Sequence, residues 1–251
     1  MSDPRGTTVR DAIGADGFAV VEQVLAPDQV ADAVAALDRI FAAEADIAAE
    51  RGWLTDAYRV AYALPAKDRL FADLCTHPSL LALAGAVLGD DCVVAGCNGL
   101  DVVPGGTAQV LHRDHVDPTP GTTVYLHVVC ALDPFTPERG ATRLVAGSHR
   151  EPDVRADAAR LEHRTTTATV HPGGVVAFDG TLAHGAGANT TDAHRRALHV
   201  FFARPWAQPH WDFPRTFSDA EAALLSDDQR ARFGFDQRPR RFDRAQRRVV
   251  R

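Results

Sequence analysis

The chain has 251 residues, of which 45% are hydrophobic and 24% are charged, and this globular composition excludes wholesale disorder. The net charge of −6 argues against a nucleic-acid partner. No apolar run reaches the roughly 20 residues of a membrane span, the N-terminus has no apolar signal-peptide core, and four cysteines are too few for a disulfide scaffold. We therefore expect a cytoplasmic protein without a membrane partner.

Residues 1–90 are expected to form a mostly helical support. A short β-type run at residues 17–21 comes first. A long helix is expected from Pro27, because proline in the first turn loses no helical hydrogen bond. Its apolar residues recur at steps of three and four, which predicts one buried stripe. A second helix is expected over Pro78–Leu88 and is ended by Gly89.

Residues 91–205 are expected to form a β core. Short β-rich runs, separated by Gly, Pro, Asp and Asn, occur at residues 92–95, 124–132, 166–170, 175–178 and 197–202. Residues 206–251 are expected to add a helix near 219–233 and a basic tail, which we interpret as a solvated terminus. We find no repeat and no linker, so residues 1–251 are expected to form a single domain.

A histidine and a carboxylate lie two residues apart in the segment that contains His112 and Asp114. On an extended chain they share a face, whereas Arg113 and His115 point the opposite way. Such a pair supplies two ligands of a 2-His-1-carboxylate site, which suits non-haem Fe(II) because it leaves coordination positions open. A polar surface loop could contain the same two residues, so the pair alone does not distinguish a metal site from a surface loop.

The second histidine of such a site has to come from elsewhere in the chain. His184 is the strongest candidate, because it follows a β-rich run and begins a glycine-rich turn. Eleven residues later, Arg195 enters another expected strand, where a buried guanidinium requires an anion such as a dicarboxylate. Arg195 and His199 would share a cavity-lining face. Arg196 stays the alternative, because a shift of one residue would exchange the two arginines.

Three segments resemble the phytanoyl-CoA dioxygenase family and occur in the family's order. They are Gln109-x-x-His112-x-Asp114, the stretch ERGATRLVAGSH at residues 138–149, and His184-Gly-x-Gly-x-Asn189 with Arg195. The stretches DGFAVVE at 16–22 and HPSLL at 77–81 are also similar to the family's N-terminal part. The resemblance covers roughly residues 9–205.

The resemblance implies a mainly β fold with flanking helices, namely a double-stranded β-helix of the jelly-roll, cupin-like type. It also implies an oxygenase that depends on Fe(II) and uses 2-oxoglutarate and O₂ as co-substrates. The residues carried over by matching position are the catalytic metal ligands His112, Asp114 and His184, the 2-oxoglutarate-binding Arg195, and the further co-substrate residues Gln109 and Asn98.

Two positions depart from the family's pattern. Ala186 stands where a hydroxyl residue often lies near 2-oxoglutarate, and Ala146 stands where proline is common. Neither change removes a ligand. Asp114 argues against halogenation, because halogenating relatives replace this carboxylate with a small residue. We therefore predict hydroxylation, desaturation, cyclisation or epimerisation of a small molecule.

Lys67 is the only lysine among 27 cationic residues, which is typical of GC-rich bacterial genomes. By association, we expect a substrate from secondary metabolism, such as antibiotic biosynthesis. The alternative is a cupin-like zinc-dependent hydrolase or isomerase that uses the same His/Asp/His site, but it gives Arg195 no role. A binding module that has lost catalysis fits the complete triad less well. Neither the substrate's identity nor the oligomeric state follows from the sequence.

The other candidate residues are assigned structural roles. His115 lies on the wrong face to act as a ligand, and His127 has no partner that the sequence identifies. The cysteines are expected to be small core residues. Aromatic residues in the connections could cover a substrate or pack over the core, and they are Trp53, Tyr58, Tyr62, Trp206, Trp211 and Phe213.

Overall fold

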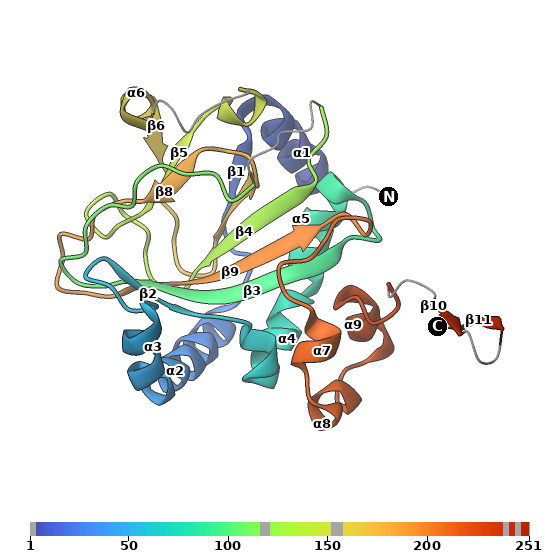
Figure 1. The fold of residues 1–251 in the computed structure, drawn as a ribbon. Helices are drawn as coiled ribbons and strands as arrows, with labels where there is room; N and C mark the ends of the chain where they lie inside the picture. The colour runs from blue at the N-terminus through green and yellow to red at the C-terminus, as the bar shows by residue number, and fades with distance from the viewer. Residues whose placement is uncertain (1–3, 116–120, 152–157, 238–240, 244–246, 251) are drawn as a thin grey trace.

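Antiparallel β-sheets form the centre of the computed structural model, which describes residues 4–115, 121–151, 158–237, 241–243 and 247–250 (Figure 1). The larger sheet has six strands in the order β1-β7-β4-β9-β3-β2, and the smaller sheet has three in the order β6-β5-β8. The strands of these sheets are β1 Phe18–Val21, β2 Tyr58–Ala61, β3 Val93–Val102, β4 Tyr125–Ala131, β5 Thr142–Val145, β6 Thr165–Thr167, β7 Val175–Asp179, β8 His184–Ala186 and β9 Arg195–Ala203.

Helices flank the sheets. The α-helices are α1 Pro4–Asp16, α2 Pro27–Ala43, α3 Ala45–Arg51, α4 Arg69–Cys75, α5 Pro78–Leu88, α6 Ala158–Glu162, α7 Phe213–Thr216, α8 Asp219–Ala223 and α9 Asp227–Arg232. Two single turns of 3₁₀-helix lie at Leu64–Ala66 and Ser148–Arg150. Among the described helices, none is by itself long and apolar enough to cross a membrane, although α4 and α5, bent by 45°, meet the length and composition criteria as a pair.

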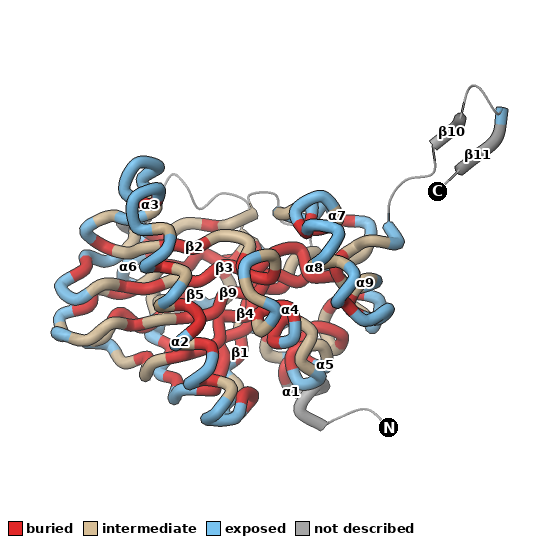
Figure 2. The backbone as a smooth tube through the Cα atoms, turned by 90° about the horizontal axis from the view of Figure 1, so that it is seen from below, coloured by how far each residue is buried: buried red, intermediate tan, exposed pale blue. Residues whose placement is uncertain are grey.

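The two largest apolar clusters hold the layers together. In the larger core, Leu37 of α2 and Leu83 of α5 pack with Val128 of β4 and Val200 of β9, so these helices cover one face of the larger sheet. The second core lies on the other face of the sheet and contains Phe178 of β7 with residues of β4, β5 and β9. Figure 2 shows that the buried residues are concentrated along these strands. The cavity that contains His112, Asp114 and His184 opens on the same face of the larger sheet as the second core.

The mainly β fold with flanking helices is confirmed. Every predicted β-rich run between residues 92 and 202 overlaps an observed strand. Helix α2 begins at Pro27, and α5 spans Pro78–Leu88 with Gly89 as its C-cap, as the local signals predict. Among the described strands, none of the larger sheet is hydrogen-bonded to a strand of the smaller sheet, so the sheets form no closed barrel.

Two local predictions are wrong. The helix predicted near 219–233 is two short helices, since α8 ends at Ala223 and Ser226 then caps α9 by accepting a hydrogen bond from the Gln229 N–H. His184, predicted to begin a turn, instead begins strand β8, since β5 supplies a pairing partner from far away in the sequence.

The division at residues 90 and 205 remains a prediction, although two edge strands of the larger sheet, β1 and β2, come from the first ninety residues. The predicted basic tail lies in part outside the described residues, at 238–240, 244–246 and 251. Its described part forms a two-stranded hairpin, β10 Arg241–Asp243 with β11 Arg248–Val250, which stands apart from the sheets in Figure 1.

Candidate metal centre

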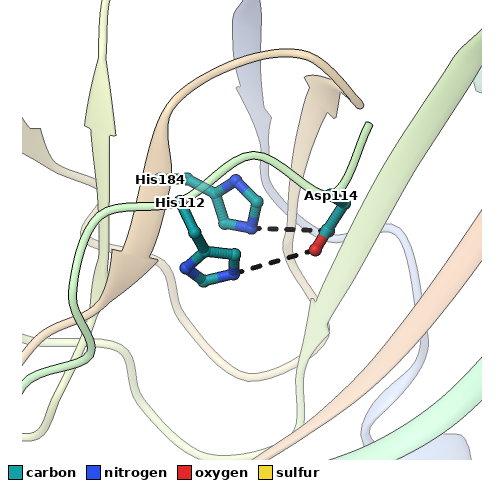
Figure 3. Close-up of side chains that lie close together, drawn as sticks. All are labelled: His112, Asp114 and His184. Carbon is teal, nitrogen blue, oxygen red and sulfur yellow. Dashed lines mark ion pairs between the residues drawn. The ribbon is translucent and has the colours of Figure 1, made fainter. Parts of the chain in front are cut away.

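His112, Asp114 and His184 come together at one end of strand β8 (Figure 3). The backbones of His112 and His184 form an isolated antiparallel bridge, in which each N–H donates to the other's carbonyl over 2.9 Å. This pairing brings the two imidazole centroids to 4.5 Å. The Asp114 Oδ1 lies 3.7 Å from His112 Nε2, and its Oδ2 lies 3.5 Å from His184 Nε2. One long-range backbone contact therefore gathers three candidate ligands.

Both imidazoles are oriented by backbone carbonyls. His112 Nδ1 lies 3.0 Å from the Val110 carbonyl, and His184 Nδ1 lies 3.0 Å from the Leu182 carbonyl. Because a carbonyl only accepts, each Nδ1 carries a proton and each Nε2 presents its lone pair. Both lone pairs face Asp114, as Figure 3 shows. Histidines that bind metals are commonly oriented in this way.

Burial sets the charge of the site. Desolvation lowers the pKa of His184 from 6.5 to about 4, although Asp114 opposes the shift. Burial alone would raise the pKa of Asp114, but the imidazoles of His127 and His184, together with a hydrogen bond from His127, hold it well below its ordinary value. Near neutral pH, His184 is thus neutral and Asp114 is ionised, as metal ligation requires.

Arg195 begins strand β9 and is only 2% exposed. Its guanidinium stacks on the ring of Phe135 at 3.8 Å and donates from Nη2 to the Thr142 hydroxyl over 2.9 Å. Its Nε has no hydrogen-bond partner among the described residues. Burial lowers the pKa of Arg195 to about 10, against the attraction of more distant carboxylates. A buried cation with a free donor is a site for an anion.

Arg196 occupies the opposite face of β9. It forms ion pairs with Asp38 of α2 at 2.8 Å and with Asp133 at 3.0 Å. The neighbouring arginines thus have different environments: Arg195 lines a cavity, and Arg196 joins the sheet to a helix. Of the two registers that the sequence leaves open, the structure has the one in which Arg195 faces inward.

A cavity of about 220 Å³ joins these groups. Gln109 and Asn98 line it, and their side-chain oxygens are already used by the protein. The Gln109 oxygen accepts from the Ala186 N–H at 2.9 Å, and the Asn98 oxygen accepts from Trp211 Nε1 at 3.1 Å. Their amide nitrogens are therefore the groups that could serve a ligand.

The rest of the cavity wall is largely aromatic and aliphatic. Its other lining residues include Tyr58, Tyr62, Val60, Leu100, Val129, Phe178 and Phe201. Of the aromatic residues that the sequence left open, Trp211 packs on Tyr62 beside the cavity with 5.6 Å between ring centroids, whereas Trp206 is 70% exposed and Phe213 is fully buried.

The Gly147-Ser148-His149 turn ties the two ligand segments together. Arg113, next to His112, donates to the carbonyls of Ser148 and Glu151. The Ser148 hydroxyl accepts from the Ala183 N–H at 2.9 Å, one residue before His184. Arg113 thus points away from the metal site, as the alternation along the chain predicts, and its hydrogen bonds stabilise the backbone that carries His112.

Two further histidines lie beside the triad: His199, which the sequence placed on the cavity-lining face of its strand, and His127, which the sequence left without a role at the site. His127 of β4 places its Nδ1 2.9 Å from Asp114 Oδ2, and His199 of β9 places its Nε2 3.0 Å from the same nitrogen. The prediction that His127 has no partner is therefore wrong. Because His127 lies two residues from both Tyr125 and Val129 on β4, the three side chains share one face of the strand. This spacing indicates that His127 faces inward, but it does not indicate which residue it contacts.

The chain is similar to known proteins in sequence and in fold. Residues 14–197 match the family model described as Phytanoyl-CoA dioxygenase (PhyH). The chain is 31% identical over 235 residues to the dioxygenase trt7 of Aspergillus terreus, which covers 83% of this chain and 78% of that protein.

Two solved structures are similar in fold. The epimerase SnoN, solved in complex with Fe³⁺, alpha-ketoglutarate and nogalamycin RO, is 22% identical with a TM-score of 0.69, and the match covers 81% of this chain and 85% of SnoN. AviO1 from Streptomyces viridochromogenes is 26% identical with a TM-score of 0.68, and the match covers 83% of this chain and 98% of AviO1.

Proposed function

The chain belongs to the phytanoyl-CoA dioxygenase family and is a 2-oxoglutarate-dependent non-haem iron dioxygenase, and from this premise we propose that His112, Asp114 and His184 hold its iron. Two imidazole lone pairs and one ionised carboxylate fit Fe(II), because this donor set leaves coordination positions for a co-substrate and O₂. Backbone carbonyls orient both rings, so the site is prepared before metal arrives.

Arg195 is proposed to bind the distal carboxylate of 2-oxoglutarate. Its buried guanidinium has an unpartnered Nε, which supports this role. The Thr142 hydroxyl is held against the guanidinium and lies directly across the β5–β8 pairing from Ala186. Thr142 therefore supplies the hydroxyl that Ala186 lacks. The amide nitrogens of Gln109 and Asn98 are proposed to complete the co-substrate site.

Bound iron and 2-oxoglutarate would supply the activation of O₂ and the oxidation of a substrate C–H bond. The chain's own contribution is to fix ligand geometry, to neutralise the co-substrate's carboxylate and to exclude water. The apolar wall around Phe178 and Phe201 serves the last of these roles.

The proposed substrate is a neutral small molecule with aromatic or alicyclic surface. Among the described residues that line the cavity, Asp114 is the only carboxylate, and Arg195 is the only lysine or arginine. Both already have proposed roles, so no charged side chain is left to bind a charged substrate. Tyr58 and Tyr62 remain at the wall to stack on a ring or to contact a hydroxyl group. The relative trt7 is named a dioxygenase and SnoN was solved with nogalamycin RO, which supports a tailoring oxidation, hydroxylation in the simplest case, of a secondary metabolite.

The experiment is a succinate assay. The protein, loaded with Fe(II) under anaerobic conditions and then given 2-oxoglutarate and O₂, is expected to release succinate and CO₂ in equal amounts, and a neutral substrate with an aromatic or alicyclic ring should raise the rate. His184→Ala should abolish the release. Zn(II)-loaded protein should be inactive, which separates this function from a zinc hydrolase. Succinate release that is independent of iron, or is unchanged in His184→Ala, would refute the proposal.

A further inference from the structure

A third imidazole contacts the carboxylate of the proposed metal site. His127 is fully buried on β4, and its Nδ1 lies 2.9 Å from Asp114 Oδ2. His199 stands behind it on the neighbouring strand β9, with its Nε2 3.0 Å from the same Nδ1. The ring of His127 is packed against Phe201 at 4.6 Å and Phe178 at 5.3 Å between centroids. Its orientation is therefore fixed by the core.

The contacts of His127 determine where its proton lies. An ionised carboxylate only accepts, so the Nδ1 that faces Asp114 carries the hydrogen. The Nε2 of His127 has no partner among the described residues and is buried. A bare acceptor nitrogen there is less costly than a buried N–H without an acceptor. His127 is thus a donor to Asp114 through Nδ1, with the Nε2 of His199 sharing the same hydrogen.

We propose that His127 is a positioning residue that holds Oδ2 of Asp114, so that this carboxylate binds the metal through Oδ1 alone. The inference rests on the proposed function, because it requires Asp114 to be a ligand. A carboxylate free to turn can bind a metal through both oxygens. It would then occupy a position that the 2-oxo acid or O₂ needs. Holding one oxygen in a hydrogen bond prevents this.

The same three residues could instead hold a metal of their own, because ligand atoms of Asp114, His127 and His199 lie within 4.8 Å of one another. The hydrogen-bonded arrangement is favoured on two grounds. The 2.9 and 3.0 Å separations are those of ordinary hydrogen bonds. A metal there would also compete for Asp114 with the His112 and His184 lone pairs.

Three substitutions of His127 test the inference through metal binding rather than turnover. The amide nitrogen of asparagine lies where Nδ1 lies in histidine, and that of glutamine lies closer to Nε2. Titration of the metal-free protein with Co(II) should give one equivalent bound. His127→Leu and His127→Gln should weaken the affinity by roughly 10- to 100-fold, as is usual when a hydrogen-bond partner of a ligand is removed. His127→Asn should stay within a few-fold of the wild type.

The visible absorption of bound Co(II) gives a second readout, because its intensity falls as the coordination number rises. We expect the wild type and His127→Asn to share a spectrum, and His127→Leu to show a weaker band from a two-oxygen carboxylate. His115→Leu is the matched control. It also removes an imidazole that packs edge-on to His127, with 5.4 Å between centroids, but one that has no hydrogen bond to Asp114. Its Co(II) affinity should stay within a few-fold of the wild type.

Thermal unfolding of each metal-free variant separates loss of the fold from loss of the site. Wild-type Co(II) affinity and spectrum in a folded His127→Leu protein would overturn the inference. So would two equivalents of metal in the wild type, with one lost in His199→Leu, since this would make the cluster a second metal site. If His184→Ala binds Co(II) as the wild type does, the proposed triad itself fails, and that outcome is distinct from failure of His127 alone.

Discussion

Two adjacent arginines at the start of β9 show how strongly the environment of a side chain determines its role. Arg196 is balanced by two carboxylates, so its charge has a structural use. Arg195 donates to a hydroxyl and stacks on a ring, and burial lowers its pKa to about 10 although more distant carboxylates oppose the shift. An uncompensated buried cation is expensive unless a ligand pairs with it. Its retention here is consistent with an anionic co-substrate.

Replacing Arg195 with glutamine should raise the KM for 2-oxoglutarate by roughly 10- to 100-fold, because a charge-assisted hydrogen bond to a buried carboxylate contributes about 1.5–3 kcal/mol. The steady-state rate of succinate release against 2-oxoglutarate concentration gives the value. Arg196→Gln is the control, which should lower the thermal stability and leave this KM within a few-fold of the wild type. The opposite pattern would show that Arg196 binds the co-substrate.

At the scale of strands, the pairing of β5 with β8 brings Thr142 opposite Ala186. Cross-strand neighbours lie about 4.5–5.5 Å apart, so a hydroxyl on either strand reaches the same place. Thr142→Val keeps the shape of the side chain but removes the hydroxyl that accepts from Arg195. We expect a several-fold higher KM for 2-oxoglutarate, measured by succinate release, and little loss in Thr142→Ser.

The double variant Thr142→Val/Ala186→Ser then tests compensation, because it moves the hydroxyl to the opposite strand. Recovery of at least half of the lost affinity is expected, and Ala186→Ser alone should change the KM little. Failure of the second substitution to restore binding would mean that Thr142 acts through packing rather than through its hydroxyl.

At the scale of helices, the C-terminal region depends on two matching caps. Ser218 is the N-cap of α8 and Ser226 is the N-cap of α9, and each forms a capping box. Helix α8 buries none of its residues, whereas α9 buries Gln229, which bonds to Asp73 of α4 at 2.8 Å. Ser226→Ala should therefore lower the free energy of unfolding by about 0.5–2 kcal/mol. Ser218→Ala should have the smaller effect. Urea unfolding compares them, and an equal loss would show that α9's packing adds nothing to its cap.

For the whole molecule, the elements with complete local signals could be predicted from the sequence. Helix α5 has proline at its start and Gly89 at its end, and both of its limits were predicted. The break at Ser226 was also readable, because a serine followed three residues later by Gln229 forms a capping box. The apolar spacing over 219–233 favours one continuous helix, but the cap at Ser226 overrides it.

The candidate site was predictable only in part. Alternation along an extended chain places His112 with Asp114, and the family resemblance adds His184 and Arg195. The backbone bridge that joins His112 to His184 is a long-range contact, and strands of three or four residues such as β8 are too short to show a period. His127 shows its face by alternation on β4, but nothing local indicates that Asp114 will lie opposite it.

The buried imidazoles give the whole fold a pH dependence. Burial lowers the pKa of His184 and of His115 from 6.5 to about 4, and it lowers the pKa of His199 well below 6.5. In the unfolded chain these rings take up protons as the pH falls through about 6.5. The unfolded state therefore binds more protons than the metal-free fold between pH 6.5 and 4, and the free energy of unfolding falls as the pH falls through this window.

His184 alone should account for up to about 3 kcal/mol of that loss, because its pKa lies some two and a half pH units below the value in the unfolded chain, at 1.36 kcal/mol per unit. Urea unfolding of the metal-free protein at several pH values measures the slope. His184→Asn, whose amide nitrogen can still donate to the Leu182 carbonyl, should flatten the profile between pH 6.5 and 4. An unaltered slope in His184→Asn would mean that water or a rearranged ring already solvates the His184 imidazolium within the fold.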